Sequence, residues 1–293
     1  MARLLQTIVD GLADGSIYAA LALALVLIYR ATGVVNFAQG EMATCSTFIA
    51  WGLLQAGLPL AAALGLTFVI AFIGGMLVER VVLRPTEGSD ALTIVILTVG
   101  LYFLFNSADG WIWGFDSHSF PSVFSTSRLS VGGAHLTAQS VGTVGVLVAV
   151  AAILYAFFQR TDLGLAMRAA AQGPDSSRLA GVPVDRMLMF GWGVAAVLGA
   201  VAGALVAPAL FLNVNTMSSV LIYAFAAAAL GGLDSPVGAL IGGWIIGVAQ
   251  NLAGTYVGFI GGDLEILVPL AIITVVLLIR PTGLFGSREV VRV

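Results

Sequence analysis

Charged residues are what this sequence has least of. Its 293 residues include 12 basic and 15 acidic side chains, or 9% of the chain, whereas a soluble domain carries about 25%. Hydrophobic residues make up 59%. A chain this apolar could not cover its surface with polar groups in water, so it is predicted to fold in a lipid bilayer. The 36 glycines then indicate closely packed membrane helices rather than flexible linkers.

Lysine is absent altogether, because all 12 basic residues are arginine. This absence excludes a P-loop, whose lysine binds nucleotide phosphates, so any ATP that is used must be hydrolysed by another chain. Cys45 is the one cysteine; it cannot form an internal disulfide, and its apolar surroundings predict a packing role. A net charge of −3 with scattered arginines provides no basic stripe for nucleic acid.

Long uncharged runs predict the membrane segments, since a spanning helix needs about 20 mostly apolar residues. The runs cover residues 15–29, 42–78, 91–108, 129–159, 187–233, 235–262 and 266–279. Polar or turn-forming residues divide two of them, near 57–59 and at 213–219. The fold class is therefore an all-α polytopic membrane protein with nine hydrophobic segments and eight to ten crossings. Asp10 and Asp14 are expected near the end of the first helix, which is atypical of a cleaved signal peptide.

Glycine pairs at four-residue spacing allow two helices to approach closely. They occur at Gly199/Gly203, Gly238/Gly242, Gly243/Gly247 and Gly254/Gly258. Helix packing is the favoured interpretation, and the lining of a pore is the alternative.

The placement of arginine predicts the orientation, because cytoplasmic loops are enriched in basic residues. Arg160, Arg168, Arg178 and Arg186 share one loop, which is predicted to be cytoplasmic. With nine crossings, ten of the 12 arginines fall on that side, including those of the C-terminus (Arg280, Arg288 and Arg292). Only Arg3 and Arg128 then lie outside.

The polar stretch 114–138 falls on the outer side and is predicted to be an extracytoplasmic loop with a turn at Gly132 and Gly133. It contains both histidines, His118 and His135. A histidine pair without a cysteine or a carboxylate cluster is a poor metal signal, so no metal site is predicted.

Two polar breaks in the apolar pattern are candidates for a transport path. The first is residues 33–41 (GVVNFAQGE), whose Asn36, Gln39 and Glu41 would be costly facing lipid. The second is residues 230–238 (LGGLDSPVG), where glycines and a proline interrupt a helical run around Asp234. Paired breaks of this kind in two halves of a chain are typical of transport paths. The alternative is that both are tight turns at the membrane surface, with Glu41 and Asp234 as solvated acids.

The loop 160–186 has its own predicted structure. Asp162 can cap a helix over residues 163–172, Gly173 ends it, and Pro174 opens a second short helix. Gly181 stands where a left-handed residue would end that helix. A loop that only joined two spans could be shorter, so these helices are predicted to dock on a cytoplasmic partner. The alternative is a surface helix lying on lipid headgroups.

These segments resemble a known family, the permease subunits of branched-chain amino acid ABC importers (the LivH-like branch). The matching pieces are residues 33–41 (GVVNFAQGE), 98–106 (TVGLYFLFN), 164–171 (GLAMRAAA), 179–182 (LAGV), 230–232 (LGG), 238–243 (GALIGG) and 281–286 (PTGLFG). The family commonly has histidine where Gln39 stands. Relatives also tend to keep a continuous helix where this chain has Gly173-Pro174 and Ser176-Ser177.

The resemblance implies a single permease domain over residues 1–293 in the inner membrane of a prokaryote. It implies a second related permease, two cytoplasmic ATPase subunits that carry ATP and magnesium, and an extracytoplasmic solute-binding protein. This chain itself would bind no cofactor and would not be an enzyme. Its substrate class would be branched-chain or related amino acids, moved by alternating access. The strongest alternative is an ATP-independent secondary transporter or channel for a small polar solute.

Two sets of residues are the resulting site candidates. The predicted translocation path comprises Asn36, Gln39, Gly40, Glu41, Asn106, Gly231, Gly232, Asp234 and Gly238. The predicted ATPase-coupling residues are Asp162, Gly164, Arg168, Asp175, Arg178, Leu179, Gly181 and Val182.

Overall fold

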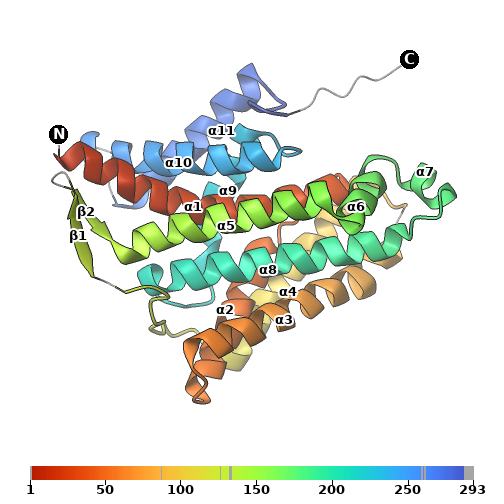
Figure 1. Ribbon diagram of the computed structural model, residues 1–293, viewed down its shortest axis with the longest axis horizontal. Helices are drawn as coiled ribbons and strands as arrows, with labels where there is room; N and C mark the ends of the chain where they lie inside the picture. Colours follow the sequence, from red (N-terminus) through yellow and green to blue (C-terminus); the bar gives the residue numbers. More distant parts are fainter. Residues whose placement is uncertain are drawn as a thin grey trace. The chain divides into compact units, whose positions relative to one another are not determined.

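The computed structural model describes residues 2–86, 88–125, 127–131, 134–258, 260 and 262–286. Within them the α-helices are α1 (Ala2–Thr32), α2 (Gln39–Gln55), α3 (Leu60–Val78), α4 (Ala91–Trp113), α5 (Ala138–Arg160), α6 (Asp162–Gln172), α7 (Pro174–Leu179), α8 (Val184–Leu210), α9 (Thr216–Gly231), α10 (Pro236–Tyr256) and α11 (Leu267–Ile279) (Figure 1). A π-helical turn (Glu79–Leu83) and a 3-10 turn (Arg84–Thr86) extend α3, and a second 3-10 turn (Gly262–Ile266) precedes α11. Strands β1 (Arg128–Val131) and β2 (Ala134–Thr137) form an antiparallel pair.

Each of the nine predicted hydrophobic segments contains one helix, and the all-α polytopic class is confirmed. Six helices in the described part of the chain are long and apolar enough to cross a membrane: Arg3–Thr32, Leu60–Thr86, Ala91–Trp113, Ala138–Arg160, Val184–Leu210 and Pro236–Tyr256. The helices α2, α9 and α11 are shorter. Both predicted breaks are present, since α2 ends before residue 57 and α8 and α9 are separate helices.

Some predictions need correction or lie outside the described residues. The helix α1 begins at Ala2, so Asp10 and Asp14 lie inside it rather than near its end. Amides satisfy both carboxylates there, because Gln6 Nε2 donates to Asp10 (2.9 Å) and Asn251 Nδ2 donates to Asp14 (2.9 Å). The loop 114–138 contains the two short strands. Gly132, Gly133, Arg288, Arg292 and the side chains of Arg128 and His135 lie outside what the structure describes.

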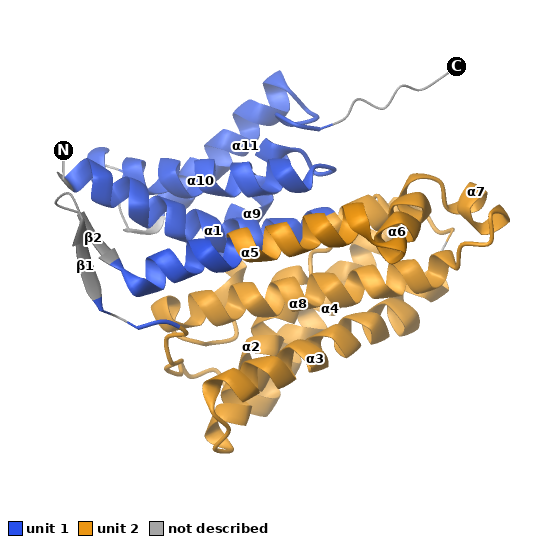
Figure 2. Cartoon of the chain, in the orientation of Figure 1, with its two compact units in different colours: residues 1–26, 124–147, 219–293 blue, residues 27–123, 148–218 orange. Residues whose placement is uncertain are grey.

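The chain divides into two compact units, which Figure 2 shows in different colours. Unit 2 (residues 27–123 and 148–218) is built around α8, along which both α2 and α3 pack, while α4 packs on α2. Small residues make these contacts close. A Cβ added to Gly75 on α3 would lie 2.8 Å from the Cβ of Ala196, and one added to Gly199 would lie 2.9 Å from Gln39 Nε2. Such close approach is how membrane helices gain packing energy without a hydrophobic driving force.

Unit 1 (residues 1–26, 124–147 and 219–293) is held by the same kind of contact between α1 and α10. A Cβ on Gly15 would lie 2.5 Å from the carbonyl oxygen of Gly243, and one on Gly243 would lie 2.5 Å from the Cβ of Ala19. The predicted packing role is thus confirmed for the pair Gly243/Gly247. It does not extend to Gly258, which has no atom within 4 Å of an added Cβ.

Candidate functional site

The first polar break is a buried connection between α1 and α2 in unit 2. Asn36 Oδ1 accepts a hydrogen bond from the backbone N–H of Ala38 (3.0 Å), which closes the turn. Asn36 Nδ2 donates to Gln39 Oε1 (3.2 Å), and Gln39 Nε2 donates to the carbonyl of Ala195 on α8 (3.0 Å). Asn36, Gln39 and Glu41 are all fully buried. The alternative of a solvated surface turn is therefore wrong for these three side chains.

Glu41 lies at the meeting point of three elements of unit 2. Asn106 Nδ2 on α4 donates both to Glu41 Oε2 (3.2 Å) and to the carbonyl of Val214 (3.1 Å). Ser218 Oγ, at the start of α9, donates to Glu41 Oε1 (3.3 Å). The structure thus brings together Glu41 and Asn106, which are 65 positions apart and were both predicted as path residues. Because lipid cannot satisfy a carboxylate, this pairing explains how Glu41 is tolerated inside an apolar helix bundle.

Asp109 belongs to the same region, although it is not among the residues predicted from the sequence. It is fully buried on α4, and neither carboxylate oxygen has a hydrogen-bond partner in the described part of the chain. Cys45 and Glu41 lie close enough to Asp109 to interact with it electrostatically. A signal was available, because Asp109 lies three positions after Asn106 and therefore on the same helix face. The uncharged run 91–108 ends immediately before it.

The second polar break lies in unit 1, between α9 and α10. The backbones of Gly231 and Gly238 are in direct contact, which only glycine permits. Ser235 Oγ caps α10 by accepting from the Gly238 N–H (3.0 Å). Gly232 has a φ of 107°, and Asp234 is half-buried. Asp234 is therefore partly exposed at the protein surface, unlike Glu41. It also belongs to a different unit from the cluster around Glu41.

The segment 281–286 packs on this turn. The N–H groups of Leu284 and Phe285 donate to the carbonyls of Leu230 (2.8 Å) and Gly231 (2.9 Å). Two sequence pieces that were recognised separately, 230–232 and 281–286, thus form one structural motif. The backbones in this motif approach each other so closely that only glycine leaves enough room.

The loop 160–186 forms α6 and α7 at the end of unit 2 where α8 begins (Figure 1). The cap of α6 is Thr161 rather than the predicted Asp162, since Thr161 Oγ1 accepts from the Gly164 N–H (3.0 Å) and Asp162 is the first helical residue. The other predicted boundaries are confirmed. Gly173 ends α6, Pro174 is the first residue of α7, and Gly181 has a φ of 83°.

One face of α6 is buried against α8. Met167 and Ala170 pack with Val184 and Met187, and Gly164 is pressed against the backbone of Phe158. The other side presents apolar residues outward: Leu163 and Leu165 are exposed, and Leu179 of α7 is 92% exposed. The predicted coupling residue Arg168 is half-buried and donates to Gln159 on α5 (3.3 Å).

An ion-pair network fixes α7 to the rest of unit 2. Asp185, in the first turn of α8, accepts from Arg178 of α7 (3.2 Å) and from Arg84 at the end of the α3 extension. Asp175 lies 3.7 Å from Arg178. These side chains are more than a third exposed, so each pair contributes only about 0–1 kcal/mol. The network therefore sets the position of α7 more than it sets stability.

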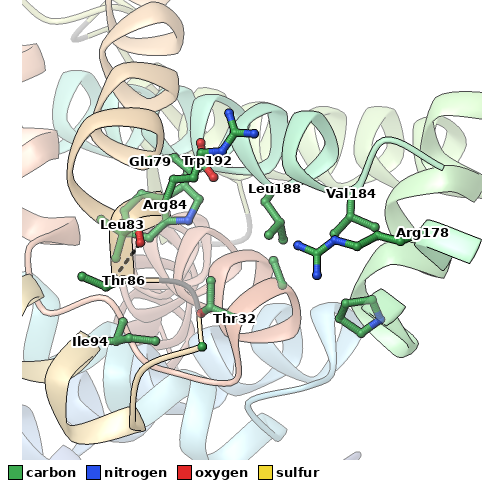
Figure 3. A pocket seen from close by; sticks show the side chains of 13 residues that line it. Thr32, Glu79, Leu83, Arg84, Thr86, Ile94, Arg178, Val184, Leu188 and Trp192 are labelled. Carbon is green, nitrogen blue, oxygen red and sulfur yellow. Dashed lines mark hydrogen bonds between the residues drawn. The ribbon is translucent and has the colours of Figure 1, made fainter. Parts of the chain in front are cut away.

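A cavity of about 250 Å³ lies beside this network (Figure 3). Arg84 and Arg178 contribute guanidinium groups to its lining, and Glu79 contributes a carboxylate. Thr32, Leu83, Thr86, Ile94, Val184, Leu188 and Trp192 also line it, together with the backbone of neighbouring turns. Glu79 and Trp192 are almost fully buried. Neither is predicted from the sequence, because both lie within or beside apolar runs.

Comparisons with known proteins cover nearly the whole chain. A family model described as branched-chain amino acid transport system / permease component matches residues 7–278. The high-affinity branched-chain amino acid transport system permease protein LivH of Salmonella typhimurium is 29% identical, over 99% of this chain and 97% of that protein. BraD of Pseudomonas aeruginosa, a permease protein of the same description, is also 29% identical, over 99% of this chain and 98% of BraD.

Similarity extends to an archaeal protein and to a solved structure. A probable branched-chain amino acid transport permease of Methanocaldococcus jannaschii is 29% identical over 91% of this chain and 87% of that protein. A chain in the structure of PsaBC from Streptococcus pneumoniae in complex with Fab has a TM-score of 0.51 at 15% identity, covering 93% of this chain and 91% of that chain. The structural match supports the fold alone.

Proposed function

The chain belongs to the family of branched-chain amino acid transport system permease components, and on this premise we propose that it forms half of the translocation path of an ATP-driven importer. Its substrates are branched-chain or related amino acids. The energy comes from two cytoplasmic ATPase subunits that carry ATP and magnesium, and a second related permease completes the path. An extracytoplasmic binding protein delivers the solute. This multi-pass protein then lies in the cytoplasmic membrane of a prokaryote, with residues 160–186 and the C-terminus facing the cytoplasm.

The observation that carries this proposal is the exposure of Leu179. A leucine that is 92% exposed on a short helix is unfavourable in water, and the Arg178–Asp185 ion pair holds that helix in place. An apolar side chain presented from a positioned helix suits docking into a groove on another protein. We therefore assign contact with the ATPase to this segment, namely to Asp162, Gly164, Arg168, Asp175, Arg178, Leu179, Gly181 and Val182.

Within unit 2, the cluster of Asn36, Gln39, Glu41 and Asn106 is proposed to stabilise one wall of the path. Its hydrogen bonds join α2 to α4 and α8, so that these helices move together when access alternates. In unit 1, the turn that contains Gly231, Gly232, Asp234 and Gly238 is proposed to serve the same purpose. Gly40 is proposed to keep the start of α2 free of a side chain.

The cavity beside the ion-pair network supports the substrate class. A free branched-chain amino acid carries one ammonium group, one carboxylate and one aliphatic side chain. The lining offers the carboxylate of Glu79, guanidinium groups from Arg84 and Arg178, and aliphatic walls such as Leu188 and Ile94. Small-molecule binding sites are typically apolar with a few placed polar groups.

The test is reconstitution in proteoliposomes with the partner ATPases, the second permease and the binding protein. We expect vanadate-sensitive uptake of labelled leucine that disappears when the ATPases are omitted. Leu179→Glu should abolish both uptake and co-purification of the ATPases, because it places a charge in an apolar contact. Leu179→Met is the matched control and should retain both. Uptake by this chain without ATPases would instead establish the secondary transporter or channel, and full activity of Leu179→Glu would refute the docking assignment.

A further inference from the structure

A second and larger cavity, of about 640 Å³, opens at the end of unit 2 where α3 finishes and α8 begins. Four of the twelve arginines of the chain line it: Arg80, Arg84, Arg178 and Arg186. Asp185 is the one acidic residue of its lining. We call this site the arginine cavity.

The arginine cavity carries a surplus of positive charge. Asp185 accepts hydrogen bonds from Arg84 and Arg178, and it can compensate only one of the four guanidinium charges. Asp175, which is 98% exposed and lies 3.7 Å from Arg178, compensates at most one more. Arg80 and Arg186 have no ion-pair partner among the described residues, so two positive charges remain in a concave site, which is the chemistry that binds a phosphate group.

The surface of α3 shows what else the ligand must contain. Exposed apolar side chains recur every three or four residues along one face, at Leu66, Ile70, Ile73, Leu77 and Val81. Arg80 and Arg84 follow in the π-helical and 3-10 extension of α3, where both are exposed and line the arginine cavity. The opposite face, with Ala71, Gly75 and Leu83, is buried in unit 2. An apolar stripe about four helical turns long thus leads directly into the arginine cavity.

We propose that the arginine cavity binds the headgroup phosphate of an anionic phospholipid, whose acyl chains lie along the exposed stripe of α3. The cavity lies at the ends of two membrane-spanning segments, Leu60–Thr86 and Val184–Leu210, where a headgroup lies in a bilayer. Basic pockets between helices on the cytoplasmic side are known to bind such headgroups. A free phosphate ion would use the arginines but not the stripe, and an ATPase surface would not be expected to require an apolar stripe within the span.

The lipid would connect parts of unit 2 that belong to different helices. Arg80 and Arg84 follow α3, Arg186 lies in the first turn of α8, and Arg178 belongs to α7. A phosphate shared among them would hold the ends of α3 and α8 together and keep α7 beside them. The lipid composition of the membrane would then influence the segment that we assign to ATPase contact.

The experiment measures lipid binding to the purified full-length chain by native mass spectrometry. The probes are dioleoyl phosphatidylglycerol, dioleoyl phosphatidylcholine and glycerol 3-phosphate. Phosphatidylglycerol should bind at least tenfold more tightly than phosphatidylcholine, and glycerol 3-phosphate should not bind. The double variant Arg80→Gln/Arg186→Gln should bind phosphatidylglycerol about 25-fold more weakly, since each basic residue near an anionic lipid contributes about fivefold.

Two matched controls keep the result interpretable. Arg160→Gln/Arg280→Gln removes two exposed arginines elsewhere and should bind within twofold of the unaltered chain. Arg80→Lys/Arg186→Lys keeps the charge and should bind at least fivefold more tightly than the glutamine variant.

Equal binding of the two lipids, unchanged binding by the glutamine variant, or equal loss in the lysine variant would overturn the proposal. Binding of glycerol 3-phosphate as tight as that of phosphatidylglycerol would assign the cavity to a phosphate ion. Loss of ATPase co-purification with unchanged lipid binding would assign it to the ATPase.

Discussion

Replacing Asn106 with alanine tests whether the buried cluster around Glu41 stabilises unit 2. The Nδ2 group of Asn106 makes two hydrogen bonds, to Glu41 Oε2 (3.2 Å) and to the carbonyl of Val214 (3.1 Å). Both acceptors belong to buried residues. The substitution removes the donor and leaves Glu41 with the longer hydrogen bond from Ser218 (3.3 Å).

The expected loss of stability is the sum of two contributions, the lost hydrogen bond to Glu41 and the unpaired carbonyl of Val214. A hydrogen bond to a charged group contributes about 1.5–3 kcal/mol, and an orphaned buried carbonyl costs about 1 kcal/mol or more. We therefore expect the free energy of unfolding to fall by about 3 kcal/mol. At about 2–4 °C per kcal/mol, the melting temperature should fall by about 6–12 °C.

Melting of the purified chain in one fixed detergent, followed by tryptophan fluorescence, measures this shift. Asn215→Ala is the matched control, because Asn215 is an exposed asparagine whose side chain makes no hydrogen bond among those described. It should melt within about 1 °C of the unaltered chain, since surface substitutions usually stay within about 0.5 kcal/mol.

A second background isolates the contact with Glu41. In a chain that carries Glu41→Gln, removal of Asn106 takes a hydrogen bond away from a neutral amide rather than from a carboxylate, and the cost should fall to about 1–2 kcal/mol. The reasoning fails if Asn106→Ala melts like Asn215→Ala. It also fails if the cost of Asn106→Ala is the same in both backgrounds, because the two residues would then not be coupled.

Three further predictions concern backbone contacts and caps. Thr161→Ala removes the cap of α6 and should lower stability by about 1 kcal/mol, seen as faster amide exchange in the first turn of α6. Gly164→Ala places a Cβ against the backbone of α5, so uptake should fall while Thr161→Ala retains most of it. Gly243→Ala brings a Cβ within 2.5 Å of Ala19 Cβ and should cost about 1–3 kcal/mol in thermal melting; Gly258→Ala, which meets nothing within 4 Å, should not, and equal shifts would contradict the packing argument.

The helices could be predicted from the sequence because hydrophobic run length is a local property. Each of the nine hydrophobic segments contains one helix, and the breaks near residues 57–59 and 213–219 follow from glycine, proline and polar residues within a few positions. The grouping into two units could not be predicted in this way. It depends on which glycine faces which backbone, as Gly75 faces Trp192, and such pairings depend on three-dimensional packing rather than on any single run.

Part of the candidate site could be predicted, because a polar residue within an apolar stretch is easily recognised in a sequence. Asn36, Gln39 and Glu41 are predicted for this reason, whereas Asn106 is predicted from the family resemblance. The complete burial of Asn36, Gln39 and Glu41 within the protein follows from the cost of placing them in lipid. Asp109 is not predicted because a charged residue is expected to end a span, whereas α4 continues to Trp113. The cap of α6 was misplaced by one residue because both Thr161 and Asp162 are good capping residues.

Unit 2 separates its polar side chains into two groups with different physical roles. Those inside the bundle, such as Gln39 and Asn106, hydrogen-bond to other protein groups, so their removal costs folding energy. The ion pairs of Asp185 at the end of α8 are partly exposed and contribute only about 0–1 kcal/mol each. Loss of Asp185 should therefore affect coupling far more than melting, whereas loss of Asn106 should affect both. Measuring melting temperature and uptake on the same variants separates a residue that holds the fold from one that positions α7.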